Sequence, residues 1–169
     1  QKIKCHVTCF VMKQKTLFKT KDYSSEFGGS LSEGRRKSAR PLSGKNPLHL
    51  VLRADTKISG SFLKHRTLID RYLKHFIQKL DGRIYKKALV SNHIHLVVLF
   101  RTRASSTNFI RAFCGTIARL LKVKWLKRPW SRILAWGRAF KIAVDYTIQN
   151  HQEAIGQIPY QVRKRKKQQ

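Results

Sequence analysis

Residues 89–100, LVSNHIHLVVLF, limit what the chain can fold into more than any other segment does. From His93 onward they are apolar and rich in β-branched side chains, apart from two histidines, which is typical of a strand buried on both faces. Because side chains alternate along a strand, His93 and His95 project from one face, while Ile94 and Leu96 project from the other. The segment therefore predicts an interior strand that carries two imidazoles side by side.

Two imidazoles at this spacing have two interpretations. Each neutral ring presents a lone pair, and a rigid strand pre-organises the pair, so together they can bind one divalent cation. Alternatively, both are core histidines whose ring nitrogens bond to backbone groups. Other features of the chain are needed to distinguish a metal site from a packed core.

Three further strands are expected around this one, over residues 48–54, 83–90 and 131–135. The first ends in turn-like polar residues, and the last lies within a basic, aromatic loop. The connection that leads into the histidine strand is only Ser91-Asn92, which is typical of an antiparallel hairpin.

Two amphipathic helices are expected between these strands. The first is capped by Ser59 or Ser61, and its apolar residues recur at intervals of three and four: Phe62, Ile69, Tyr72, Leu73, Phe76 and Leu80. The second opens at residues 105–107 and carries these apolar residues on one side: Phe109, Phe113, Ile117 and Leu120. A third helix is expected over about 139–152.

The elements thus follow one another as strand, helix, strand, strand, helix, strand. This is the order of a ferredoxin-like split βαβ sandwich, an α+β fold with one antiparallel sheet and its helices on one face. The domain is expected to span residues 47–156, with a basic, extended arm over 1–46 and a basic tail over 157–169. Within the arm, KIKCHVTCFV alternates and predicts a short strand of its own.

The charge of the chain points to its partner. It has 37 lysines and arginines against 8 acidic residues among 169, a formal net charge of +29. Such an excess repels itself unless a polyanion neutralises it, so nucleic acid is the expected partner. A membrane is the weaker candidate, since no apolar run approaches the roughly 18 residues of a membrane span. The 3 cysteines imply no disulfide framework or four-ligand zinc site, which favours a reducing cytoplasm.

The residues that we expect to contact nucleic acid gather in two places. The first group lies on the arm and the second in the basic, aromatic loop: Arg35, Arg36, Lys37 and Arg40, then Lys122, Lys124, Lys127 and Arg128. Trp125, Trp130 and Trp136 interleave with the loop charges and could stack on unpaired bases. At least one of the three is expected in the core, and Trp125 is the stacking candidate.

The third helix offers the histidine pair a nucleophile and a further ligand. Tyr146 and Asn150 lie four residues apart, so they stand about 40° apart on one face of the helix. The opposite face is expected to meet the core through these residues: Phe140, Val144, Thr147 and Ile148. The alternative is an ordinary interface tyrosine with a polar residue near a helix end.

These motifs resemble those of a known family over about residues 47–156. NHIHLVV is similar to the His-hydrophobic-His motif of the HUH single-strand endonucleases. YTIQNHQEAIG is similar to the tyrosine helix of their single-tyrosine branch, the REP-associated tyrosine transposases and related small insertion-sequence transposases. The strand pair, the spacing and the tyrosine helix in this order make the resemblance fairly specific.

The resemblance implies a role for each residue. Tyr146 would attack a DNA phosphate, His93 and His95 would hold Mg²⁺ or Mn²⁺, and Asn150 would complete the metal shell. Family members often have proline just before the first motif's Asn-His and just after the second motif's Asn, where this chain has Ser91 and His151. These departures leave Gln149 and His151 open as alternatives to Asn150.

The resemblance implies a metal-dependent endonuclease and strand transferase, acting at single-stranded or hairpin DNA through a 5′-phosphotyrosine. It would work in the bacterial cytoplasm at the nucleoid, as a monomer or a homodimer. The main rival is a non-catalytic hairpin DNA or RNA binder derived from a transposase, or a ribosomal-type RNA protein. A hydrolase with two metal ions is disfavoured, because 8 carboxylates are few for a carboxylate-rich site.

Overall fold

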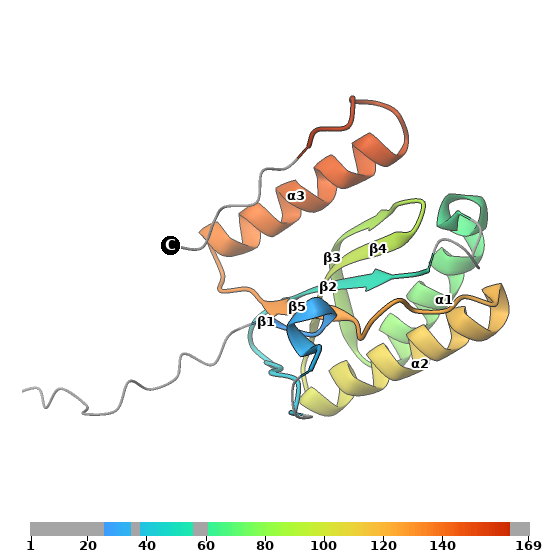
Figure 1. Ribbon diagram of the computed structural model, residues 1–169. Helices are drawn as coiled ribbons and strands as arrows, with labels where there is room; N and C mark the ends of the chain where they lie inside the picture. The colour runs from blue at the N-terminus through green and yellow to red at the C-terminus, as the bar shows by residue number, and fades with distance from the viewer. Residues whose placement is uncertain (1–25, 35–37, 56–60, 163–169) are drawn as a thin grey trace, which may run out of the picture.

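The computed structural model describes residues 26–34, 38–55 and 61–162. Within them the chain forms one antiparallel sheet of five strands in the order β1-β5-β2-β4-β3 (Figure 1). The strands are β1 (Glu26–Phe27), β2 (Leu48–Arg53), β3 (Gly82–Leu89), β4 (His93–Phe100) and β5 (Trp130–Ile133). The helices are α1 (Arg66–Lys79), α2 (Arg103–Leu121) and α3 (Arg138–Ala154).

The strand order confirms the ferredoxin-like fold. Strands β5-β2-β4-β3 form the expected four-stranded arrangement, with α1 connecting β2 to β3 and α2 connecting β4 to β5. These two helices pack together on one face of the sheet, whereas α3 covers the other face (Figure 1). The helices on one face are thus the two crossover helices, and the third helix adds a layer opposite them.

Strand β4 supplies side chains to both layers. Ile94, Leu96 and Val98 are fully buried in the main core, beneath α1 and α2. Val97 points the other way, into a smaller core with Leu134 and residues of α3. Because β2 and β3 pair with β4 on either side, its backbone is hydrogen-bonded along both edges. The predicted interior strand is confirmed.

Several boundaries differ from the sequence prediction because side chains cap the helices elsewhere. Ser61 caps a short 3₁₀ turn, Phe62–His65, and α1 begins only after it. The second helix begins at residue 103, because the Thr102 hydroxyl accepts a hydrogen bond from the Ser105 backbone N–H at 3.0 Å. Leu120 was expected on the apolar side of this helix but is 41 % exposed.

The arm is not extended throughout. Glu26–Phe27 pairs with β5 as an edge strand, and a 3₁₀ turn over Gly29–Ser32 follows it. A sequence rich in Ser and Gly gave no apolar period that could indicate these elements. The strand expected in KIKCHVTCFV lies outside the described residues, as do Arg35, Arg36, Lys37 and the basic run in the tail.

Gly82, at the start of β3, offers a test of the main core. A Cβ atom there would lie 2.4 Å from Phe100 Cε1, in a ring that is buried in the core. We expect Gly82→Ala to lower the free energy of unfolding by about 1–3 kcal/mol, because the ring has to shift. Urea denaturation measures this.

The matched control is Gly115→Ala in the middle of α2, where a Cβ atom meets nothing within 4 Å. This change should raise the free energy of unfolding by about 0.5–1 kcal/mol, because alanine favours the helix over glycine. Equal urea midpoints for Gly82→Ala and the unaltered protein would contradict the proposed packing of Phe100.

Candidate functional site

A cleft of about 1030 Å³ opens beside β2, β4 and α3. Its lining includes His93 and His95 from β4, Tyr146 and Asn150 from α3, and His49 from β2. Residues of the 126–130 loop and of the 29–30 turn also contribute to the lining. The cleft therefore brings together the predicted nucleophile, the predicted histidines and part of the basic loop.

Strand register explains why three histidines meet there. Arg53 is paired with His93, and Val51 with His95, so β2 and β4 present these residues on the same face of the sheet. His49 lies one pair further along, diagonal to His95. Diagonal neighbours on adjacent strands are within reach of long or aromatic side chains. The sheet thus places the His49 ring next to His95.

The rings that line the cleft pack closely together. The centroids of His93 and His95 are 4.7 Å apart, and the Tyr146 ring lies 5.5 Å from that of His95. The His49 ring lies 6.0 Å from Tyr146 and 5.4 Å from Trp130. A tyrosine ring and three imidazoles, from three elements of the fold, are therefore assembled in one place.

Hydrogen bonds orient the predicted ligands. His93 Nδ1 lies 2.7 Å from Asn92 Oδ1, and His95 Nδ1 lies 3.3 Å from His49 Nε2. Asn150 Nδ2 donates to the Tyr146 carbonyl oxygen at 2.7 Å. Because the Asn150 amide nitrogen is bonded to its own helix, the side-chain oxygen is its remaining polar atom.

The buried face of α3 differs in part from the prediction. Ala143, Thr147 and Asn150 form its buried stripe, whereas Val144 and Ile148 are only partly buried. Asn150 lies about 60° from Thr147 and about 40° from Tyr146 around the helix, so it can belong to both faces. The sequence pattern places this residue with Tyr146 on the face opposite the core, and in the structure it is buried.

The alternatives to Asn150 point elsewhere. Gln149 Nε2 donates to Glu153 Oε1 at 2.9 Å, and Gln149 is not part of the cleft lining. His151 lines a second cavity, together with Asp70 and Lys87, beside α1 and β3. Burial and the nearby cations lower the pKa of His151. Of the three candidates, Asn150 is the one that lines the cleft.

The cleft offers nitrogen and oxygen donors for a cation. In residues 26–34, 38–55 and 61–162, no group of three or more His, Cys, Asp or Glu side chains is arranged to hold a metal ion. The candidate set is therefore two imidazoles, of His93 and His95, and the amide oxygen of Asn150. Glu153 adds a carboxylate to the same lining. Such a set suits a divalent cation that accepts both nitrogen and oxygen.

Comparison with known proteins decides the family. The sequence model of the family described as "Transposase IS200 like" matches residues 45–155, which is most of the chain. The chain belongs to this transposase family. No curated protein matches it. Among solved structures, it is similar to a REP-associated tyrosine transposase bound to a REP hairpin, with 12% sequence identity and a TM-score of 0.56, over 69% of this chain and 72% of that one.

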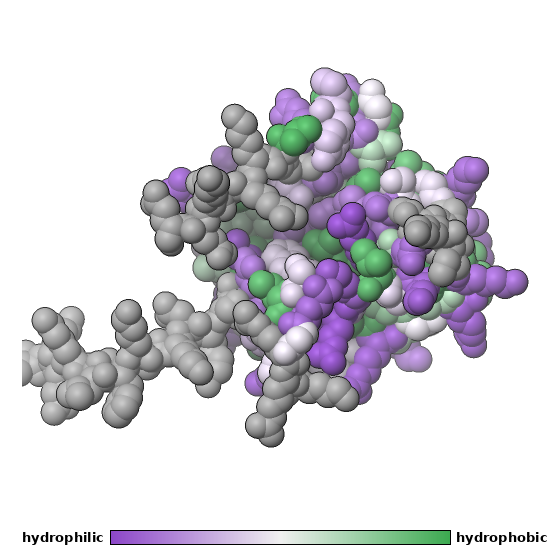
Figure 2. Space-filling model, in the orientation of Figure 1, coloured by the Kyte–Doolittle hydropathy of each residue, from purple (hydrophilic) through white to green (hydrophobic). Residues whose placement is uncertain are grey.

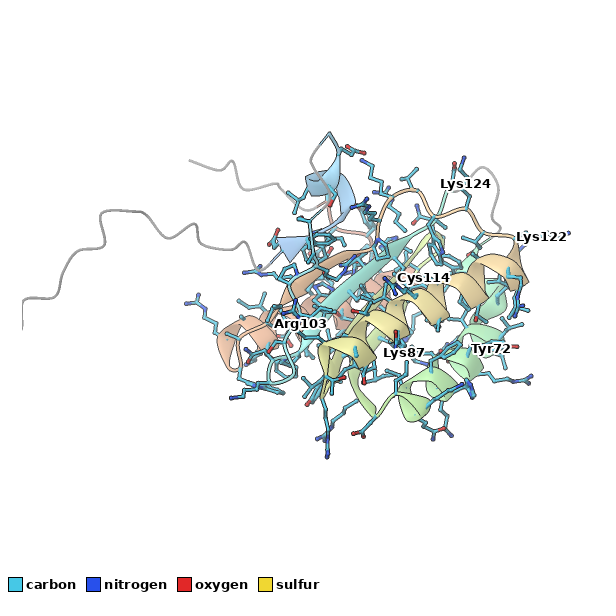
Figure 3. The ribbon with its side chains drawn as sticks, turned by 90° about the horizontal axis from the view of Figure 1, so that it is seen from below. Tyr72, Lys87, Arg103, Cys114, Lys122 and Lys124 are labelled. Atoms are coloured by element: carbon cyan, nitrogen blue, oxygen red, sulfur yellow. The ribbon has the colours of Figure 1, made fainter. Side chains whose placement is uncertain are left out.

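On the face of this IS200-like transposase shown in Figure 2, hydrophilic residues are interspersed with hydrophobic ones. Of the predicted loop residues, Lys127 and Arg128 line the cleft. Lys127 also forms an ion pair with Glu33 at 2.6 Å. Lys122 and Lys124 are exposed and do not line the cleft, since they lie beyond the C-terminal end of α2 (Figure 3). None of the helices in the described ranges is long and apolar enough to cross a membrane.

Arg40, expected to contact DNA, is committed to the protein itself. Its guanidinium donates to Ser131 Oγ and, at 2.7 Å, to the Pro129 carbonyl oxygen. It also lies 4.6 Å from the ring centroid of Phe27. Burial lowers the Arg40 pKa to about 10, so the side chain stays charged at neutral pH. Arg40 joins β1, β5 and the loop that lines the cleft.

Trp125, expected to stack on bases, is partly buried and packs against the main core. Its Nε1 donates to the Cys114 carbonyl oxygen at 3.1 Å, and its ring lies 6.0 Å from that of Phe62. Composition alone could not separate this tryptophan from Trp130, which does line the cleft.

Burial raises the pKa of the Cys114 thiol to about 12, so this thiol is protonated at neutral pH.

His49 is the main residue that sequence reasoning missed. It is 6 % exposed, and burial together with Arg132 lowers its pKa to about 4, so it is neutral at pH 7. A signal was present: in PLHLVLRA the alternation places His49 on the face opposite the buried leucines. The pattern of this segment predicts a strand over residues 48–54 but assigns no role to His49.

The role of Arg40 can be tested through stability. Arg40→Met keeps the apolar stem but removes the guanidinium, which leaves the Pro129 carbonyl oxygen without this donor. We expect the free energy of unfolding to fall by about 2 kcal/mol, the usual effect of losing hydrogen bonds from a charged group. Chemical denaturation measures the change.

Arg128→Met serves as the control, because Arg128 is exposed beside the same cleft. It should change the free energy of unfolding by less than about 0.5 kcal/mol. If both variants have the stability of the unaltered protein, Arg40 does not hold the loop.

Proposed function

We propose that this chain is a metal-dependent DNA endonuclease and strand transferase that acts at single-stranded or hairpin DNA, with Tyr146 as nucleophile. The observation that carries the proposal is the packing of the Tyr146 ring against His95, in a cleft that also contains His93 and Asn150. Membership of a transposase family supports DNA as substrate. The similar structure with a bound REP hairpin supports a hairpin as the form of DNA.

His93, His95 and Asn150 would hold one Mg²⁺ or Mn²⁺ ion. When bound, such an ion supplies positive charge that stabilises the oxygens of the scissile phosphate and helps to orient it. The protein fixes the positions of the atoms that would bind the ion. Two imidazoles come from one strand, and the amide oxygen comes from the neighbouring helix.

The Tyr146 oxygen would attack the phosphorus in line with the departing oxygen. The new bond joins the tyrosine oxygen to the 5′ phosphate, the bond from phosphorus to the 3′ oxygen breaks, and its electron pair leaves with that oxygen. The phenol loses its proton and the 3′ oxygen gains one. The 3′ hydroxyl of another strand can reverse the step, which gives strand transfer without a further energy source.

The basic residues would hold the DNA in place. Lys127 and Arg128 are positioned to contact phosphates at the cleft, and the Trp130 ring forms part of the same wall. Other basic residues would extend the path along the backbone: Arg35, Arg36, Lys37, Lys122 and Lys124. A chain with a net charge of +29 would also stay associated with DNA in the bacterial nucleoid.

Replacing Tyr146 by phenylalanine tests the nucleophile. The change removes one oxygen and keeps the ring that packs on His95, so hairpin binding should remain within a few-fold. The covalent protein–DNA adduct, seen on a denaturing gel after mixing with labelled single strand and Mn²⁺, should disappear. Chelation of the metal, or the double change His93→Ala with His95→Ala, should also abolish it.

Tyr160→Phe is the matched control, since Tyr160 lines the same cleft but is 72 % exposed. It should form the adduct like the unaltered protein. An adduct that persists in Tyr146→Phe would identify another nucleophile. If the unaltered protein forms no adduct with any hairpin from its genomic neighbourhood, the chain is a binder that kept the transposase fold.

Salt dependence tests the electrostatic part of binding. With about eight phosphate contacts and a slope near −0.7 per contact, a fourfold rise in salt should weaken single-strand binding by about three orders of magnitude. Fluorescence anisotropy at several salt concentrations measures the slope. A slope near zero would show that the basic residues do not contact the DNA backbone.

A further inference from the structure

His49 lines the cleft but has no part in the proposed reaction. It comes from β2, is 6 % exposed, and its Nε2 lies 3.3 Å from Nδ1 of His95. The edge of the Trp130 ring and the Tyr146 ring pack around it. His49 is thus a buried imidazole that is fixed by packing and contacts a predicted metal ligand. These contacts indicate a role for it in the site.

We propose that His49 is a positioning residue that sets the tautomer of His95. In this arrangement His95 Nδ1–H donates to His49 Nε2, so the lone pair of His95 is on Nε2 and is available for a metal ion. The inference rests on the proposed function, because it requires His95 to be a metal ligand. It goes further by assigning a role to a residue outside the predicted ligand set.

The direction of the hydrogen bond follows from the chemistry of imidazole. A neutral ring has one N–H and one lone pair, so His95 can bind a metal through Nε2 only when Nδ1 carries the proton. That proton needs an acceptor, and His49 Nε2 lies within hydrogen-bonding distance of it. If His49 Nε2–H donated to His95 Nδ1 instead, His95 would carry its own proton on Nε2. It could then not bind a metal ion through Nε2.

His93 shows the same arrangement. Its Nδ1 lies 2.7 Å from Asn92 Oδ1, an oxygen that can only accept a hydrogen bond. This bond therefore places the His93 proton on Nδ1 and its lone pair on Nε2. In histidine metal sites, the ring nitrogen that does not bind the metal generally donates a hydrogen bond to such a partner, which orients the ring. Asn92 and His49 would do this for the two ligands of one strand.

The surroundings of His49 hold its ring in place. The Trp130 ring meets it edge-on with the ring centroids 5.4 Å apart, and the Tyr146 ring lies 6.0 Å away. Arg132 is its paired residue on the other neighbouring strand, β5. A ring held on these sides keeps Nε2 within reach of His95.

The first measurement uses the unaltered protein without metal. Nitrogen-15 NMR of the histidine rings distinguishes a protonated ring nitrogen from one with a lone pair. We expect His95 to carry its proton on Nδ1, and addition of a diamagnetic ion, Zn²⁺, to shift the Nε2 signal. A His95 ring with its proton on Nε2 in the metal-free protein would overturn the inference.

The second measurement compares two substitutions at residue 49. His49→Gln retains an acceptor oxygen near the position of Nε2, whereas His49→Phe retains only the ring. The affinity for Mn²⁺ alone, followed by the electron paramagnetic resonance signal of the unbound ion, should fall about 10- to 100-fold in His49→Phe. It should remain within about threefold in His49→Gln. Equal affinities in both variants would overturn the inference.

The control and the reference variant separate this inference from the proposed function. His75→Phe changes an exposed histidine on α1 and should leave Mn²⁺ affinity unchanged. His95→Ala should lose most of the affinity. If it does not, His95 is not a ligand, and both the proposed metal site and this inference fail. If His95→Ala loses affinity but His49→Phe does not, only the role of His49 fails.

Discussion

The alternation of side chains along β4 is the constraint on which the rest of the structure depends. This strand is hydrogen-bonded along both edges, so its register cannot slip without breaking two ladders at once. A slip of one residue would move Ile94 and Leu96 to the cleft and would bury His93 and His95 beneath α1 and α2. The same pairing that completes the main core therefore fixes the imidazoles on the opposite face.

The site depends on a second layer that is much smaller than the first. Helix α3 is held to the sheet by a few apolar residues around Val97, Leu134 and Ala143, and it brings Tyr146 to the histidines. The main core fixes the strands, whereas this small core sets the distance between Tyr146, the proposed nucleophile, and the histidines of β4. Residues of the cleft itself, through ring contacts and hydrogen bonds, then complete the arrangement.

Periodicity in the sequence was sufficient to predict the order of elements, the interior histidine strand and the ferredoxin-like fold, because each depends on local alternation. Periodicity could not predict which group a side chain contacts when more than one partner is possible. The Arg40 guanidinium can bond a phosphate or a carbonyl oxygen, and only the folded chain places Pro129 next to it. Trp125 and Trp130 are alike in composition, yet one packs on Phe62 and the other lines the cleft. Asn150 lines the cleft together with Tyr146, and its burial depends on how α3 packs in the folded chain.

The segment that precedes the part matched by the family model also shapes the cleft. The match begins at residue 45, yet β1, the turn after it and Arg40 lie earlier and shape the loop that lines the cleft. Gly28 adopts a φ of 86°, and a Cβ atom there would collide with the Pro129 carbonyl oxygen, so the two segments must change together. Mutations before residue 45 can therefore reshape the wall of the cleft while Tyr146 and the histidine strand remain intact. The shape of the cleft can thus vary independently of the residues that we propose for catalysis.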